Sequence, residues 1–336
     1  YVNLKNRYNW GVSVMHIPYL YGAGGQCIEQ STGSLVTVID RRRFYQSQAS
    51  GMAAYPLSVT RRVEANVGLT RFGFDYEREV YVTRPDGFVT RDRQNIDNPD
   101  ALYFATANVA LVGDYSNFGF TSPVVGGRYR FQVGISQGSY NFFPVVADYR
   151  RYFHTRPFTF ALRGTHFGNY GIKLDSRTRY GQEYLFSSYY PTFVRGYGGR
   201  SFEDTECQPT QTDSCPFITN RLIGSRAAVV SAEVRLPLLG TEQFGLINFP
   251  YLPTELSLFA DAGLSWNGTE GETVRPFAFV TGDDARTTAD RIPVTSVGIS
   301  SRFNVLGYAI FEVFYAYPFQ RPDKGAHFGF ALAPGW

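Results

Sequence analysis

In "AAVVSAEVRLP" (227–237), apolar and polar residues alternate one by one from Val230 to Leu236. A period of two predicts a β-strand, because successive side chains of a strand point to opposite faces. The polar face carries ionisable groups in the middle of the strand, which a hydrated interior can accommodate. The apolar face consists of Val230, Ala232, Val234 and Leu236, and the polar face of Ser231, Glu233 and Arg235.

The same alternation recurs along the chain. Further on, Leu256 and Leu258 fall on one face of a predicted strand and Asp261 on the other. Helical periodicity is nearly absent, so the sequence predicts an all-β protein. The clearest further examples are "FTFALRGT" (158–165), "TELSLFADAG" (254–263) and "AHFGFALAPGW" (326–336).

A soluble β-sandwich would also alternate, but three features favour a membrane barrel. Ionisable groups occur in mid-strand, many strands exceed about ten residues, and Tyr and Phe gather at strand ends, as in "FYAYPF" (314–319). We therefore predict a transmembrane, antiparallel, up-and-down β-barrel, because only helices and closed barrels satisfy the backbone in lipid. The residues expected to face lipid are Val230, Val234, Leu256, Leu258, Phe328 and Phe330.

The alternation predicts about twelve strands, with no clean domain boundary, so one barrel is expected over residues 1–336. Long connections are predicted at 22–42, 83–100, 172–224 and 266–293, and the third of these is the longest. Long loops of outer-membrane barrels lie outside the cell. The predicted strands are 7–21, 43–57, 61–82, 101–115, 127–138, 143–155, 158–171, 225–237, 254–265, 294–303, 306–317 and 326–335.

The composition excludes several other classes of protein. Aromatic residues make up 17% of the 336 residues and the net charge is only +3, so nothing indicates nucleic-acid binding. No stretch approaches the roughly 18 apolar residues of a membrane-spanning helix. The acidic residues Glu203, Asp204 and Glu206 lack the spacing of a calcium loop, and no cofactor or metal is expected.

Two of the three cysteines lie close together in sequence. Cys207 and Cys215 flank a polar stretch within the longest loop, and a disulfide between them is predicted, which implies an oxidising compartment. The alternative is two free thiols. Cys27 has no obvious partner, and neither the cysteine spacing nor a histidine cluster indicates zinc.

Four segments in order resemble the outer-membrane assembly-factor superfamily, which includes BamA, TamA, the two-partner-secretion transporters and the bacterial surface-antigen barrels. "VRGY" (194–197) looks like the signature of that family's long sixth loop. The other three look like its later strands, the last being an aromatic-ended signal strand with Phe328, Phe330 and Trp336. They are "SAEVRLPL" (231–238), "FADAG" (259–263, Phe259 to Gly263), and the pair "FEVFYAYPF" (311–319) and "HFGFALAPGW" (327–336).

This resemblance implies that loop 172–224 folds into the barrel lumen and that Arg195 pairs with Asp261 on the inner wall. Glu233 would be a second acidic neighbour, and the alternation independently turns both carboxylates inward. Gly196 would permit a tight turn, Val194 belongs to the same motif, and Tyr197 would pack against aromatic residues of the lumen such as Phe259. The alternative is that Arg195 is an exposed loop cation.

The family barrel has sixteen strands, eleven of them before this loop, whereas only about seven are predicted here. We therefore expect either an N-terminally incomplete barrel or a smaller variant. The predicted function is insertion or translocation of proteins at the bacterial outer membrane. The alternative is a membrane-anchoring barrel of a larger fusion protein with an upstream hydrolase or propeller.

An enzyme is not expected, because a hydrolase needs a histidine beside a nucleophile and His166 has no convincing serine partner. A wide passive pore is disfavoured by the loop expected in the lumen. The partners expected are outer-membrane lipid and lipopolysaccharide, together with client proteins or a periplasmic domain. No nucleic acid is expected.

Overall fold

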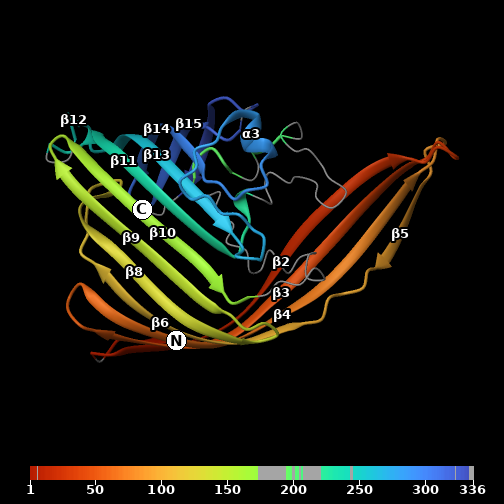
Figure 1. The fold of residues 1–336 in the computed structure, drawn as a ribbon, viewed down its shortest axis with the longest axis horizontal. Helices are drawn as coiled ribbons and strands as arrows, with labels where there is room; N and C mark the ends of the chain where they lie inside the picture. Colours follow the sequence, from red (N-terminus) through yellow and green to blue (C-terminus); the bar gives the residue numbers. More distant parts are fainter. Residues whose placement is uncertain are drawn as a thin grey trace. The chain divides into compact units, whose positions relative to one another are not determined.

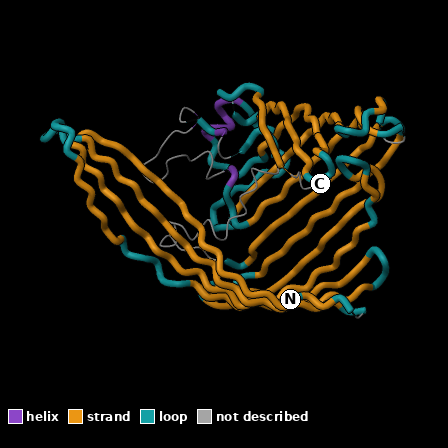
Figure 2. The backbone as a smooth tube through the Cα atoms, turned by 180° about the vertical axis from the view of Figure 1, so that it is seen from behind, coloured by secondary structure: helices purple, strands orange, loops and turns teal. Residues whose placement is uncertain are grey.

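The computed structural model describes residues 1–5, 7–172, 194–198, 201–203, 206, 221–242, 245–321 and 323–332. Strands make up most of this part of the chain (Figure 2). No helix within these ranges is long and apolar enough to cross a membrane.

The elements of the described residues are sixteen strands and one short helix. They are β1 (Val2–Asn3), β2 (Asn9–Ile28), β3 (Leu35–Pro56), β4 (Arg61–Thr83), β5 (Val89–Asn95), β6 (Leu102–Asp114), β7 (Asn117–Phe118), β8 (Pro123–Gly138), β9 (Phe143–Thr155), β10 (Phe158–Tyr170), β11 (Arg226–Gly240), β12 (Ile247–Asn248), β13 (Thr254–Trp266), α3 (Gly282–Thr287), β14 (Val294–Val305), β15 (Ala309–Pro318) and β16 (His327–Leu332).

The long strands follow one another in a single up-and-down sheet (Figure 1). The order is β1-β2-β3-β4-β6-β8-β9-β10-β11-β13-β14-β15-β16, while the short β5, β7 and β12 pair with β4, β8 and β11. Antiparallel pairing joins each strand from β8 to β16 to the next in this order. This confirms the predicted all-β, antiparallel, up-and-down fold. The order begins at β1 and ends at β16 in the described chain, and closure into a barrel stays a prediction.

All twelve predicted strands are present, but the long connection predicted at 22–42 is wrong. β2 continues to Ile28 and β3 already begins at Leu35, so only a short turn separates them. The segment "GAGGQC" (22–27) hides the alternation, because small residues carry no face pattern. Strands pair through backbone groups, so glycines can continue a strand without a face pattern. Gly25, for example, lies opposite Val38 in the pairing of β2 with β3. The connection predicted at 83–100 likewise contains β5.

The two faces of the later strands differ as the alternation predicted. In β11 and β13, Glu233 and Asp261 are each only 3% exposed, whereas Val230 and Leu258 are 58% and 61% exposed. We call the face that carries Glu233 and Asp261 the inner face, and the opposite face the outer face. The predicted lipid-facing residues Leu256, Phe328 and Phe330 are also exposed, and Val234 is partly exposed.

The chain divides into two compact units, each described by itself. The first comprises Tyr1–Tyr55, Glu64–Asn108 and Ile135–Asn141, and the second comprises Pro56–Val63, Val109–Gly134 and Phe142–Trp336. All residues of the site described below belong to the second unit. The prediction of one domain over residues 1–336 stays a prediction.

Leu258→Arg is expected to destabilise the protein by about 2–4 kcal/mol, because Leu258 lies mid-strand on the apolar outer face, which is predicted to meet the hydrocarbon of the membrane. Urea titration of Leu258→Arg in lipid vesicles measures the change in the free energy of unfolding. Leu306→Arg is the matched control, since Leu306 is 75% exposed in the turn between β14 and β15. Equal costs at the two positions would show that the outer face does not meet lipid.

Candidate functional site

Residues 194–198 lie against the inner face of β11, β13, β14 and β15. Both Val194 and Tyr197 are fully buried, although they belong to the longest connection of the chain. Their environment is apolar and comes from strand residues and from the residues just before β11. The members of this cluster are Val194, Tyr197, Leu222, Ala227, Val229 and Val294, with Phe202 packed against it.

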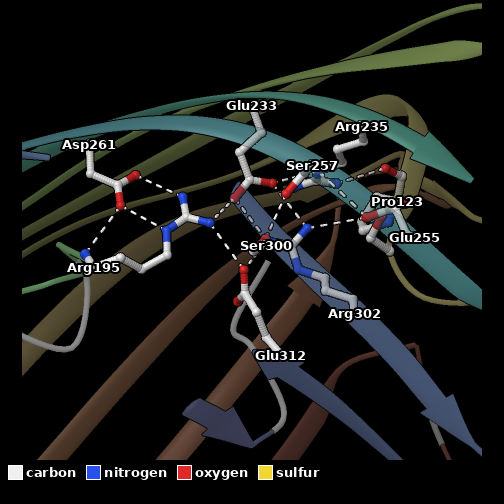
Figure 3. A network of polar contacts seen from close by, with 11 residues as sticks. Pro123, Arg195, Glu233, Arg235, Glu255, Ser257, Asp261, Ser300, Arg302 and Glu312 are labelled. Carbon is white, nitrogen blue, oxygen red and sulfur yellow. Dashed lines mark hydrogen bonds and ion pairs between the residues drawn. The ribbon is translucent and has the colours of Figure 1, made fainter. Parts of the chain in front are cut away.

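Arg195 reaches the inner face and holds Asp261 with two parallel hydrogen bonds (Figure 3). Its Nε and Nη2 donate to Oδ2 and Oδ1 of Asp261, each at 2.8 Å, and its backbone N–H donates to Oδ2 at 3.2 Å. Arg195 is 8% exposed. A planar guanidinium is suited to this bidentate geometry, and the structure thus brings together the two residues that the resemblance paired.

Two further carboxylates meet the same guanidinium. Nη1 of Arg195 lies 2.7 Å from Oε1 of Glu233 and 3.0 Å from Oε1 of Glu312. The guanidinium carbon also lies 3.6 Å from the ring centroid of Phe259, a cation–π distance. Gly298 leaves room for that ring, because a Cβ at this position would lie 2.7 Å from it.

Glu233 is the centre of a larger buried network. Arg302 donates to its two oxygens at 3.0 and 2.8 Å, and Arg235 donates to Oε2 at 2.6 Å. Arg302 also lies 3.3 Å from Glu255 and 3.2 Å from Glu312. Three guanidinium groups therefore face four carboxylates, and the network as a whole carries a formal net charge of −1. The network consists of Arg195, Arg235, Arg302, Glu233, Glu255, Asp261 and Glu312, all within 8% exposure.

The strand register explains how β13, β14 and β15 contribute to this network. Glu255 lies directly opposite Arg302, and Arg302 lies directly opposite Glu312. Neighbouring residues of one register row have their Cβ atoms only about 4.5–5.5 Å apart. A row of acid, base and acid thus crosses three strands.

Gly196 makes the turn that allows Arg195 to enter the inner face. Its φ is +90°, a conformation that favours glycine, and its carbonyl accepts a hydrogen bond from Nη1 of Arg321 at 2.6 Å. Arg321 follows β15 and also holds both oxygens of Glu206 at 2.7 Å and the Ser201 carbonyl at 2.7 Å. Arg321 is therefore a second buried arginine that fixes segment 194–198, through the backbone carbonyl of Gly196.

Tyr197 is held by hydrogen bonds of its hydroxyl group as well as by the apolar cluster. Its hydroxyl can donate to Gln320 Oε1 at 2.9 Å or to the Thr295 carbonyl at 3.1 Å, and it accepts from the Gln320 N–H at 3.1 Å. The Phe259 ring contacts the Arg195 guanidinium and the Phe314 ring. The aromatic residue packed against the apolar cluster of Tyr197 is Phe202, and the predicted packing of Tyr197 on Phe259 itself stays a prediction.

Burial and charge act on the titratable groups of the loop segment. Burial raises the pKa of the Tyr197 phenol, so it stays a neutral donor. Burial alone would lower the pKa of the Arg195 guanidinium, but Glu233 and Asp261 raise it above its ordinary value. Burial is the largest influence on Glu206 and raises its pKa, but the hydrogen bonds from Arg321 and the Glu203 N–H and the charges of Arg321 and Lys324 together lower it below its ordinary value. Arg195 and Glu206 are thus both charged near neutral pH.

The other predicted residues lie apart from this network. Gly263 lies in β13 opposite Val229 and Val294. Phe328 and Phe330 lie on the outer face of β16, where their rings contact Tyr315 and Phe311. Trp336 and the predicted pair Cys207 and Cys215 lie outside the described residues.

Within the described part of the chain, the hydrogen bonds of His166 go to a backbone carbonyl and a tyrosine rather than to a serine. One ring nitrogen lies 2.9 Å from the Ala227 carbonyl and the other 2.9 Å from the Tyr170 hydroxyl, and the ring stacks on Trp266.

Sequence reasoning missed four of the charged residues. Glu255 lies six positions before Asp261, an even spacing that puts both on one face, so the alternation could have found it. Arg302 and Glu312 become neighbours only through the register of strands that are not adjacent to Arg195 in sequence. Arg321 carries no signal in the sequence, because it acts from a loop.

Solved structures that are similar to this chain include a BamA and a CdiB. BamA from Haemophilus ducreyi lacking POTRA domains 1–3 is 12% identical, with a TM-score of 0.46, over 98% of this chain and 70% of that chain. CdiB from Acinetobacter baumannii is 12% identical, with a TM-score of 0.41, over 98% of this chain and 57% of that chain. No family model and no curated protein matches the chain. The strand pairing described above is what defines the fold.

Proposed function

We propose that the chain is an outer-membrane β-barrel that mediates insertion or translocation of proteins at the bacterial outer membrane. The observation that carries this proposal is the buried bidentate contact of Arg195 with Asp261, which holds a loop segment on the inner face. The same strands carry apolar residues on the outer face. A polar interior and an apolar exterior are what a barrel in lipid requires.

The proposed role needs no catalytic residue. Client strands would add to the edge of the sheet by exchanging backbone hydrogen bonds, and β16, the last strand of the order, would provide that edge. While a client strand is added, segment 194–198 would fill the lumen and hold β11, β13, β14 and β15 in their register. Outer-membrane lipid and lipopolysaccharide would surround the outer face, and client proteins or a periplasmic domain would be the protein partners.

Client folding in proteoliposomes tests this function. A urea-unfolded eight-stranded outer-membrane barrel is added to vesicles that contain the protein, and its folded fraction is followed by heat-modifiable gel mobility. Faster folding than in empty vesicles is expected, with a loss of that acceleration in Arg195→Ala. No acceleration over empty vesicles would contradict the proposal and favour a barrel that only anchors another domain.

A further inference from the structure

A small hairpin lies at the end of the sheet where β11 ends and β13 begins. It comprises Asn117–Pro123, between β6 and β8, and its first two residues form β7 and pair with the start of β8. The N–H of Gly119 donates to the Ser122 carbonyl at 2.8 Å and closes the turn. Ser122 is only 2% exposed, which is unusual for the tip of a connection.

The hairpin contacts strands that are not its neighbours in the sheet. β8 pairs with β6 and β9, yet the hairpin is bonded to β11, β13 and β14. The Ser122 hydroxyl lies 2.9 and 2.8 Å from the two carboxylate oxygens of Glu255. The other contacts are Arg235 Nη1 to the Pro123 carbonyl at 3.2 Å (Figure 3) and the Asn304 side-chain amide to the Phe120 carbonyl.

This hairpin is held by polar contacts together with the burial of Thr121, Ser122 and Pro123. A cavity of about 400 Å³ lies beside it, lined by Phe120, Thr121, His154, Leu246 and Glu255 among others. A segment with empty space on one side forfeits part of its van der Waals contacts there. The hydrogen bonds to Glu255, Arg235 and Asn304 therefore stabilise the hairpin on the side that faces the cavity.

The same buried charges connect the hairpin to the loop segment at Arg195. Glu255 shares Arg302 with Glu233 and Glu312, and both of these carboxylates also contact Arg195. If Arg195 left, Glu233 and Glu312 would draw Arg302 away from Glu255. A buried carboxylate without its cation is costly, so water would be favoured at Glu255 and the hairpin would be released.

We propose that hairpin Asn117–Pro123 is an inner gate of the barrel, held shut by Glu255 and coupled through Arg302 and Glu233 to the loop segment at Arg195. Release of the loop segment weakens the gate, although Arg195 and the hairpin share no direct contact among the described residues. This proposal depends on the proposed barrel, but it does not depend on the insertion or translocation of client proteins. Its test therefore uses no client protein.

Amide hydrogen exchange in residues 117–123 tests the gate. Ser122→Ala is expected to speed exchange about tenfold, which corresponds to about 1.4 kcal/mol, and to raise potassium chloride conductance in planar bilayers. The matched control is Ser257→Ala, since Ser257 is a buried serine of the same wall that bonds Ser300 at 2.7 Å and not the hairpin. Asn304→Ala, at a partly exposed residue near the end of β14, gives the same readout if Ser122→Ala does not fold.

Two results would overturn the proposal. If neither Ser122→Ala nor Asn304→Ala exceeds the Ser257→Ala control in exchange and conductance, the hairpin is not a gate. If either speeds exchange in 117–123 but Arg195→Ala leaves it unchanged, the coupling is absent. Either result leaves the client-folding assay untouched, so failure of the gate and failure of the proposed function are distinguishable.

Discussion

Arg195→Ala is expected to destabilise the folded protein by about 3–5 kcal/mol and to release residues 194–198 from the inner face. The substitution leaves Asp261 without its bidentate partner, and removing one member of a buried ion pair costs this much. Urea titration in lipid vesicles gives the free energy of unfolding. Limited proteolysis, with cleavage sites mapped by mass spectrometry, reports on the release of the segment.

Two further variants identify the cause of this effect. Arg195→Lys is expected to restore only part of the stability, because one ammonium group cannot hold both oxygens of Asp261 and also reach Glu233. Arg275→Ala is the matched control, since Arg275 is half-exposed and lies 3.4 Å from Asp290. An exposed pair of this kind contributes about 0–1 kcal/mol. If Arg195→Ala costs no more than Arg275→Ala, Arg195 does not anchor the loop.

Glu233→Gln is expected to cost a similar 3–5 kcal/mol, although the side chain keeps its shape. Arg195, Arg235 and Arg302 all donate to this carboxylate or lie within ion-pair distance of it. Glutamine would turn one acceptor oxygen into an NH₂ donor that faces guanidinium donors. The fraction of folded protein after refolding into vesicles, measured by heat-modifiable mobility, reports the loss.

The control for this second prediction is Glu270→Gln, at an exposed loop residue, for which no measurable change is expected. Glu233→Asp keeps the charge and shortens the side chain, so it should lose less than Glu233→Gln. The opposite ranking would mean that shape rather than charge matters at this position, and the role assigned to the buried network would be wrong.

The strands and their faces were predictable because the face of each residue follows from the alternation of apolar and polar residues among its immediate neighbours in sequence. Glu233 and Asp261 lie on the buried face for that reason, and Val230 and Leu258 on the exposed one. The pairing of Arg195 with Asp261 had a different source, the resemblance of "VRGY" (194–197) and "FADAG" (259–263) to known motifs. Alternation could turn Asp261 inward but could not say which loop residue reaches it.

The rest of the site depends on contacts between distant parts of the chain. Arg321 holds the Gly196 carbonyl from a loop 125 positions later in sequence. Ser122 reaches Glu255 across 133 positions, and nothing in the sequence around it distinguishes it from an ordinary turn serine. The extension of β2 through "GAGGQC" (22–27) was missed because glycine pairs through its backbone without leaving a face pattern.

The row of Glu255, Arg302 and Glu312 across three strands bears on how the sheet finds its alignment. A slip of one residue would turn charged side chains toward the apolar outer face, and the apolar pattern alone forbids it. A slip of two residues keeps every side chain on its own face, so burial of apolar side chains does not disfavour the slipped alignment. That slip moves a strand by roughly 7 Å, which would separate Arg302 from a carboxylate it needs. The buried charges therefore select one alignment of the three strands among those that the apolar pattern allows.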